Sequence, residues 1–143
     1  MSAESVVDAL YSGVSTKPGE GIDWASLRAL FDASARFVLR TGAEPTDTLD
    51  LDGWIDDFQR FVTDADVERR GFFERIVRSE ATTIGDIAHV LVLYEAGFPG
   101  EERAPRRGVD SIQLARRDGI WRMVSILNEL PRDGRHLPAA LAD

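Results

Sequence analysis

Apolar residues recur at helical spacing in three segments of the first half of the chain. One face of the first segment carries Val6, Val7, Leu10, Tyr11 and Val14. This spacing predicts an amphipathic helix. A second helix is expected to begin after Asp23, a residue type that often caps helix starts, and a third to cover Leu51–Val62.

Strand patterns dominate the second half of the chain. Residues that favour strands, loosely alternating with polar ones, predict strands over Ala33–Arg40, Phe72–Thr83, Asp86–Ala96, Gly108–Arg117 and Ile120–Leu130. The Asp118-Gly119 pair between the last two strands is a strong hairpin signal. Helices followed by sequential long strands predict an α+β fold with an antiparallel sheet.

The last predicted strand carries apolar residues on both faces. Alternation puts Trp121, Met123 and Leu127 on one face, and Val124 and Ile126 on the other. An antiparallel sheet with one face in water alternates more cleanly, so both faces are expected to be covered. Helices would cover one face and a second copy of the chain the other, which predicts a homodimer.

Length and composition fit one globular domain over residues 1–143. The 143 residues are 43% hydrophobic and 29% charged, which is ordinary for a folded protein. The tail over residues 132–143 contains Gly134, Pro138 and small residues, so it is expected to be loosely packed.

Charge and cysteine content exclude several classes of function. The net charge of -8 disfavours binding to nucleic acid or to anionic membrane surfaces. The absence of cysteine rules out disulfides and thiolate chemistry. The N-terminus is acidic where a signal peptide is basic, so a cytoplasmic location is expected.

The order of the elements resembles the nuclear transport factor 2-like superfamily over roughly residues 5–131. The resemblance is carried by Asp23-Trp24, Leu30-Phe31, Ala35-Arg36-Phe37-Val38 and the late strand from Arg117 to Ser125. Three further runs resemble one bacterial branch of the superfamily: Gly71–Glu74, Gly85–Val90 with Tyr94-Glu95, and Arg107–Leu114. These motifs mark a fold and not a reaction.

The resemblance implies a cone, in which about three N-terminal helices pack on a strongly curved antiparallel sheet and enclose a pocket. The superfamily includes ketosteroid isomerase, scytalone dehydratase, polyketide cyclases and proteins that only bind ligands, so fold alone does not assign a function. Ketosteroid isomerase chemistry needs a carboxylate base on a strand near the second helix and a protonated aspartate deeper in. This chain has Arg36 and no acid between residues 33 and 41, which counts against that arrangement.

His89 is the first candidate for acid–base chemistry. It stands in an apolar strand, and a histidine in a pocket can transfer protons near neutral pH. Asp86 would point to the opposite face of the strand, so a partner has to come from Glu74, Asp110 or Glu129 on another strand. We predict His89 and Glu74 as catalytic residues, while a structural histidine bonded to a neighbour is the alternative.

A second set of residues is expected to line the pocket. Ser111 and Gln113 share one face of their strand and could bind a carbonyl or hydroxyl group. Polar groups of this kind among aromatic residues are typical of ligand sites; a cross-strand hydrogen-bond network is the alternative. The predicted pocket residues are Tyr11, Trp54, Phe58, Glu95, Ser111, Gln113 and Trp121.

Two distant histidines and no cysteine give no metal-ligand spacing, so neither a metal nor a cofactor is expected. The sequence therefore predicts a pocket for a small apolar or amphipathic molecule. If the protein is an enzyme, the expected chemistry is cofactor-free dehydration, isomerisation or cyclisation of that molecule. A non-catalytic ligand-binding or protein-interaction module is the alternative.

Overall fold

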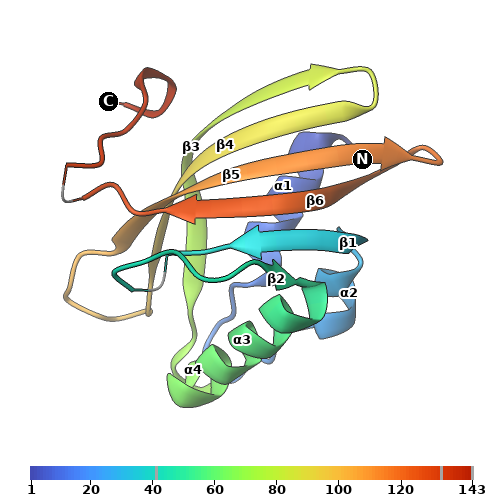
Figure 1. Cartoon of the computed structure of the whole chain (residues 1–143). Helices are drawn as coiled ribbons and strands as arrows, with labels where there is room; N and C mark the ends of the chain where they lie inside the picture. Colours follow the sequence, from blue (N-terminus) through green and yellow to red (C-terminus); the bar gives the residue numbers. More distant parts are fainter. Residues whose placement is uncertain (41, 133, 143) are drawn as a thin grey trace.

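The computed structural model describes residues 1–40, 42–132 and 134–142 of an α+β chain (Figure 1). Its helices are α1 (Ala3–Gly13), α2 (Trp24–Arg28), α3 (Leu51–Asp64) and α4 (Val67–Arg70), followed near the end by the 3-10 turn η1 (Ala139–Leu141). Its strands are β1 (Phe31–Val38), β2 (Leu49–Asp50), β3 (Phe73–Ile84), β4 (Ile87–Gly97), β5 (Arg106–Arg117) and β6 (Ile120–Glu129).

The three longest helices, α1, α2 and α3, each begin with a side-chain cap. The Ser2 hydroxyl accepts a hydrogen bond from the Ser5 amide at the start of α1. The Asp23 carboxylate, predicted as a cap, accepts one from the Ser26 amide at the start of α2, and Asp50 caps α3 in the same way. Each cap satisfies an amide that has no partner inside its helix.

One six-stranded, curved sheet runs in the order β2-β1-β6-β5-β4-β3. The long strands β3 to β6 form an antiparallel meander, as predicted. The sheet as a whole is mixed, because β1 lies parallel to β6 while all the other strand pairs are antiparallel. Parallel neighbours need a long connection, and here β2, α3, α4 and the strands β3 to β5 lie between these two strands in the sequence.

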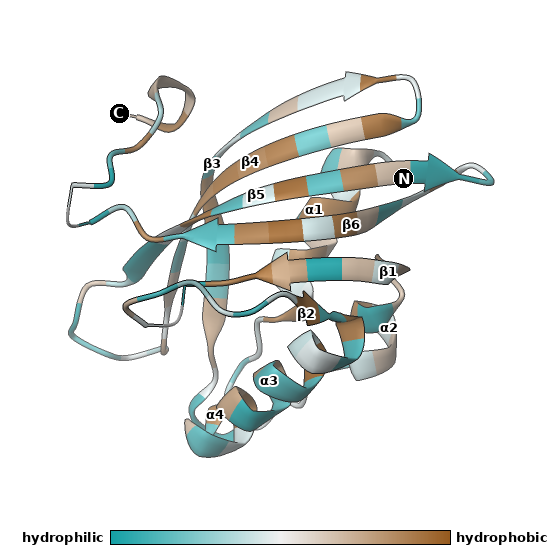
Figure 2. Ribbon diagram, in the orientation of Figure 1, coloured by the Kyte–Doolittle hydropathy of each residue, from teal (hydrophilic) through white to brown (hydrophobic). Residues whose placement is uncertain are grey.

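The core fills the space between the sheet and the helices α1 and α3. On the sheet, Phe37 and Met123 are fully buried, as are Val92 and Ile112. The Trp54 ring of α3 stacks on Phe37, with 5.0 Å between ring centroids. Figure 2 shows hydrophilic and hydrophobic residues interleaved along the strands, so one face of the sheet is apolar and faces the helices.

A β-bulge changes the faces predicted for the last strand. Gln113 pairs with Ser125, but Leu114 pairs with Met123, so Val124 is an extra residue in β6. The bulge puts Ile126 in the core, and leaves Leu127 51% exposed on the outer face. The prediction that Leu127 shares a face with Met123 is therefore wrong, because strict alternation fails across a bulge.

The C-terminal tail packs against the outer face of the sheet rather than remaining loose. Leu141 is fully buried, and its carbonyl accepts a hydrogen bond of 3.1 Å from Arg78 of β3. Arg78 pairs in register with Leu93, which is also fully buried and lies outside the main core. Two residues of the predicted tail, Asp133 and Asp143, lie outside the described residues.

Candidate functional site

A cavity of about 460 Å³ lies between the helices and the inner face of the sheet. Its apolar walls come from α1, α3, β6 and the segments around them: Leu10, Val14, Leu39, Trp54, Phe58, Phe61, Phe72, Ile126 and Leu130. Its polar side chains are Arg40, Asp57, Glu74, Tyr94, Arg106, Arg107, Asp110, Asn128 and Arg132. An apolar cavity with a few polar groups is typical of a small-molecule site.

Gly108 makes room for the most central of these polar groups. It pairs with Tyr94 across β4 and β5, and a Cβ atom at position 108 would lie 2.2 Å from the Tyr94 hydroxyl oxygen. Only a glycine therefore allows the Tyr94 ring to lie flat over β5. The hydroxyl is thereby held above the strand, between Arg106 on one side along β5 and Asp110 on the other.

Asn128 fixes the direction of the hydrogen bonds in this cluster. Its carbonyl oxygen Oδ1 accepts from the Arg40 backbone amide at 3.3 Å. Its amide nitrogen Nδ2 then donates to the Tyr94 hydroxyl and to Asp110 Oδ1, each at 2.9 Å. Because Tyr94 accepts here, its own hydroxyl hydrogen is available to a ligand oxygen in the cavity.

Asp110 is a buried acid with two donors. The Tyr11 hydroxyl donates to Asp110 Oδ2 at 2.5 Å, and Asn128 occupies the other oxygen. Burial raises the pKa of Asp110, while these two hydrogen bonds act in the opposite direction by stabilising the carboxylate. Burial and the nearby Asp110 raise the pKa of Tyr11 far above its ordinary value, so this tyrosine stays a donor.

Glu74 differs from Asp110 because its carboxyl group lacks a protein partner. Only its backbone is bonded, to the Ser15 hydroxyl. Within the residues that the structure describes, no hydrogen bond or ion pair reaches the Glu74 side chain, which lines the cavity. Burial and the neighbouring Asp110 raise the pKa of Glu74 to about 8, so this carboxyl is mostly protonated at neutral pH and can ionise close to it.

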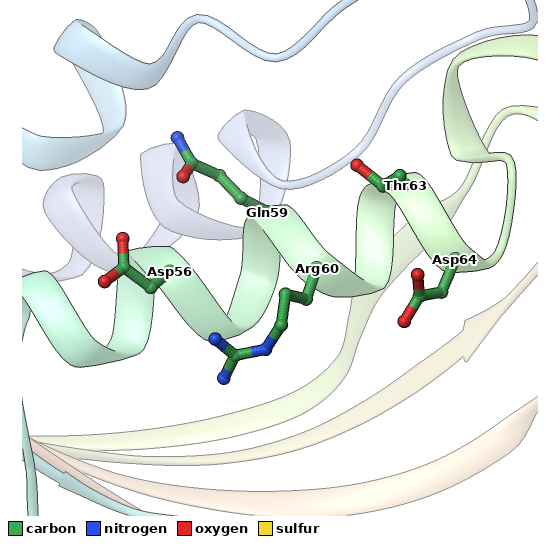
Figure 3. Close-up of a pocket in the computed structure, with 5 residues that line it drawn as sticks. All are labelled: Asp56, Gln59, Arg60, Thr63 and Asp64. Carbon is green, nitrogen blue, oxygen red and sulfur yellow. The ribbon is translucent and has the colours of Figure 1, made fainter.

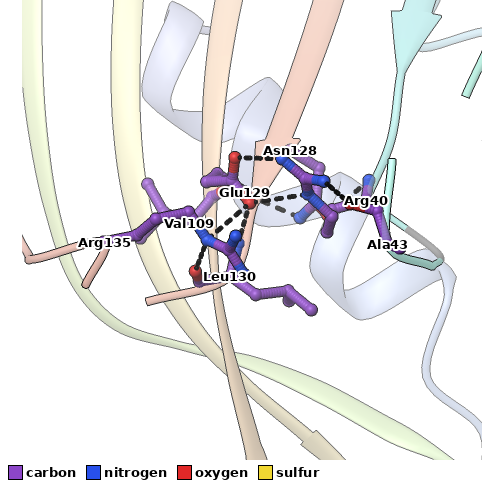
Figure 4. Close-up of polar contacts among 7 residues, drawn as sticks. All are labelled: Arg40, Ala43, Val109, Asn128, Glu129, Leu130 and Arg135. Carbon is purple, nitrogen blue, oxygen red and sulfur yellow. Dashed lines mark hydrogen bonds and ion pairs between the residues drawn. The ribbon is translucent and has the colours of Figure 1, made fainter. Parts of the chain in front are cut away.

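The mouth of the cavity is braced by an ion pair. Arg40 donates through Nε and Nη2 to the two carboxylate oxygens of Glu129, each at 2.9 Å (Figure 4). The same carboxylate lies 3.3 Å from Arg135, whose Nε donates to the Leu130 carbonyl. Hydrogen bonds from Arg40 and from the Leu130 backbone hold the pKa of Glu129 at about 2. This network ties the ends of β1 and β6 together beside Asn128.

The expected pairing of His89 with Glu74 is not formed. Glu74 pairs in register with Ala96, seven positions from His89 along β4, which corresponds to about 23 Å. His89 alternates with the core residues Ala88 and Val90, so it lies on the outer face of the sheet. Its Nε2 lies 2.9 Å from the Ser111 hydroxyl, as in the alternative of a structural histidine.

The predicted pocket residues divide between the two faces. Trp54 and Phe58 line the cavity, and Tyr11 lies behind its wall as the donor to Asp110. Ser111 and Gln113 lie on the outer face with His89, because their register partners in β4 are outer-face residues.

Two further predicted residues also lie outside the cavity. Glu95 is held on the outer face by Arg75 and Arg107, and hydrogen bonds and charge from Arg75 lower the pKa of Glu95. Trp121 is buried in the core, away from the residues that line the cavity.

Sequence reasoning missed Tyr94 and Asn128 and undervalued Asp110. The signal for Asp110 was its alternation with Ile112 and Leu114, both fully or almost fully buried, since an acid in phase with core residues is itself expected to be buried. Gly108 lies in the same phase, and it marks a close approach. Nothing local distinguishes Asn128.

A second hollow lies on the outward side of α3. Its lining residues, Asp56, Gln59, Arg60, Thr63 and Asp64, all come from this one helix (Figure 3). It has no apolar wall and no contribution from the sheet. Among the described residues, no three histidine or acidic side chains gather as a metal-ligand set, and no helix has the length and apolarity needed to span a membrane.

No family model matches the sequence, and no curated protein matches it either. Solved structures do match. One is an NTF2-like protein of unknown function from Pseudomonas putida KT2440, at 11% identity and a TM-score of 0.73, over 92% of this chain and 85% of that chain. Another, from Silicibacter pomeroyi DSS-3, is also an NTF2-like protein of unknown function, at 21% identity and a TM-score of 0.61, over 89% and 91%.

A third similar structure is a candidate ketosteroid isomerase from Shewanella frigidimarina. It shares 17% identity, with a TM-score of 0.59 over 89% of this chain and 94% of that chain. Identities this low support a shared fold but do not assign an activity. Together with the meander, the covering helices and the enclosed cavity, these matches establish that the chain has the nuclear transport factor 2-like fold.

Proposed function

We propose that the cavity binds a small amphipathic molecule and that Glu74 transfers protons to or from it without a cofactor. The observation that carries this proposal is a carboxyl group that lines an apolar cavity and has no partner among the described residues. A group that ionises near neutral pH is well suited to acid–base catalysis. His89 has no part in this proposal, because it lies on the opposite face of the sheet.

The remaining polar groups have supporting roles in the proposed chemistry. As a carboxylate, Glu74 removes a proton from a carbon beside a substrate carbonyl. The oxygen of that carbonyl gains negative charge and accepts the free hydroxyl hydrogen of Tyr94. Glu74, now protonated, returns the proton to another atom of the substrate. Asn128 and Tyr11 keep Asp110 and Tyr94 in place and are positioning residues.

Ring opening of 5-nitrobenzisoxazole tests the role of Glu74. A base removes one ring proton from this aromatic probe, the N–O bond breaks, and a coloured cyanophenolate forms. We expect turnover to rise with pH around 8, where Glu74 ionises, and to fall about 100-fold in Glu74→Gln. Glu80→Gln is the matched control, because Glu80 is an exposed acid on the same strand.

An unchanged rate in Glu74→Gln would overturn the catalytic proposal. If the wild type bound the probe in this cavity without opening its ring, the non-catalytic ligand-binding module would be the better description. The two outcomes can be distinguished, because binding of the probe is measured by competition and opening of its ring is measured by the colour of the product.

We also propose that two copies of the chain associate through the outer face of the sheet. Leu127 is 51% exposed there, beside Ser111 in register, and Ile87 of β4 is 62% exposed. Exposed apolar residues on this face, which the C-terminal tail covers only in part, support association. Sedimentation should give a dimer for the wild type and a monomer for Leu127→Asp, whereas a monomeric wild type would contradict the proposal. The cytoplasmic location stays a prediction.

A further inference from the structure

Arg106 is a cavity arginine without a carboxylate partner. It begins β5, pairs in register with Ala96, and shares the inward face of its strand with Gly108 and Asp110. Within residues 1–40, 42–132 and 134–142, no hydrogen bond or ion pair engages its guanidinium. Arg103 and Arg122 also have no ion pair among the described residues, but neither of them lines the cavity.

The other arginines that line the cavity are occupied. Arg40 is bound by Glu129, and Arg107 lies 3.4 Å from Glu95 on the outer face. Arg132 is engaged with the protein as well. Arg106 therefore provides the cation at this site that a ligand can pair with.

The position of Arg106 relative to Tyr94 gives the site two chemically different ends. Along β5, Arg106 and Asp110 are four residues apart on one face, or about 13 Å, and the Tyr94 hydroxyl lies over Gly108 between them. The charge of Arg106 reaches Tyr94 and lowers its pKa, against the larger raising effects of burial and of the two acids. One end of this stretch of β5 is cationic, and the other carries the Asp110 carboxyl. Glu74 lies at the Arg106 end, two strands away, because Glu74 and Arg106 both pair in register with Ala96.

We propose that Arg106 selects ligands that carry a carboxylate. The carboxylate pairs with the guanidinium at the mouth. A second oxygen of the ligand accepts the Tyr94 hydroxyl hydrogen, and the apolar body lies against Trp54 and Phe58. The substrate class is thus a small aromatic or aliphatic carboxylic acid with a carbonyl or hydroxyl group a few atoms from its carboxylate. This inference rests on the proposed function, because both take the same cavity as the ligand site.

Binding of 2-naphthoate and 2-naphthamide by titration calorimetry at pH 7 tests the inference. The two probes have the same ring and nearly the same shape, and differ in charge. We expect wild type to bind 2-naphthoate about tenfold more tightly, the size of effect given by one hydrogen-bonded charge pair. Arg106→Gln should abolish this preference while leaving 2-naphthamide affinity unchanged.

Arg103→Gln is the matched control, because Arg103 is an exposed arginine three positions away and does not line the cavity. It should retain the preference. Ring opening in Glu74→Gln is a separate readout, and it tests the proposed function alone. Equal affinities of wild type for the two probes, or a preference that survives Arg106→Gln, would overturn the role of Arg106 and leave Glu74 catalysis standing. If wild type bound neither probe, the role of Arg106 would be overturned, and so would the assignment of the cavity as the ligand site.

Discussion

The Tyr94 hydroxyl takes the space that a side chain at position 108 would need: a Cβ atom on Gly108 would lie 2.2 Å from that oxygen. The two residues are register partners on adjacent strands. The lack of a side chain at Gly108 of β5 therefore sets the position of the Tyr94 hydroxyl of β4. That hydroxyl is also the acceptor for Asn128, so one glycine supports the whole polar cluster.

Gly108→Ala should move Tyr94 and weaken the site. The added methyl group forces the ring off β5 and breaks its bond with Asn128, and overpacking of this kind costs about 1–3 kcal/mol. Urea unfolding measures this cost. Gly21→Ala is the control, because a Cβ atom there meets no atom within 4 Å. Equal stability of the two variants would show that Tyr94 does not need the space.

Tyr11→Phe should destabilise the protein more than Tyr94→Phe. Loss of the Tyr11 hydroxyl leaves Asp110 Oδ2 buried without a donor, at a cost of about 1–3 kcal/mol. Loss of the Tyr94 hydroxyl leaves Asn128 still bonded to Asp110, so a smaller cost of about 0.5–1.5 kcal/mol is expected. Urea unfolding at pH 7 compares them, and the reverse order would contradict the assigned hydrogen bonds.

Stability should fall as pH rises from about 5 to about 8, in part because of Glu74. Burial and Asp110 raise the pKa of Glu74 from 4.5 to about 8. Between these values the folded protein keeps a proton that the unfolded chain releases, so each increase in pH favours unfolding. A pKa difference of one corresponds to about 1.4 kcal/mol.

Glu74→Gln has no proton to release and should lose less stability over the same pH range than the wild type. Asp110, whose pKa burial also raises, is present in both proteins. The difference between the two unfolding curves therefore isolates Glu74. Parallel curves would mean that Glu74 titrates normally in the folded protein.

His89→Ala should affect stability and leave ring opening unchanged. His89 lies on the outer face with the Ser111 hydroxyl at 2.9 Å, a contact worth about 0.5–1.5 kcal/mol. Ser111→Ala should cost a similar amount, and the double variant should cost less than the sum, because both substitutions remove one interaction. Loss of ring opening in His89→Ala would place this histidine back in the site.

Local patterns were sufficient to predict most of the elements. The helical face around Leu10, the Asp23 cap and the hairpin at Asp118-Gly119 all depend on residues close in sequence. The parallel pairing of β1 with β6 and the bulge at Val124 do not. Both depend on how strands far apart in sequence fit together. The alternation rule placed Leu127 on the same face as Met123 because it does not allow for an extra residue between them.

The site was predicted less well because its polar groups were chosen by residue type. Their alternation with core residues along the strand, which decides the face of the sheet on which each one lies, was not used. His89 attracted attention as a titratable group in an apolar strand, yet it is out of phase with the core residues Ala88 and Val90. Glu74 was predicted as part of the site and does line the cavity. Its proposed partner was wrong, because the pairing register that separates it from His89 is set by the β3–β4 hairpin.

The hydrogen bond from Tyr11 to Asp110 joins residues 99 positions apart, and the remaining donor, Asn128, stands in the last strand. During synthesis on the ribosome, the Asp110 carboxyl is made before its amide donor exists. Contacts between such distant segments also form slowly. The nascent chain can thus build its first helix and the β3–β4 hairpin early, but it gains a binding site only after β6 has emerged and paired on both sides.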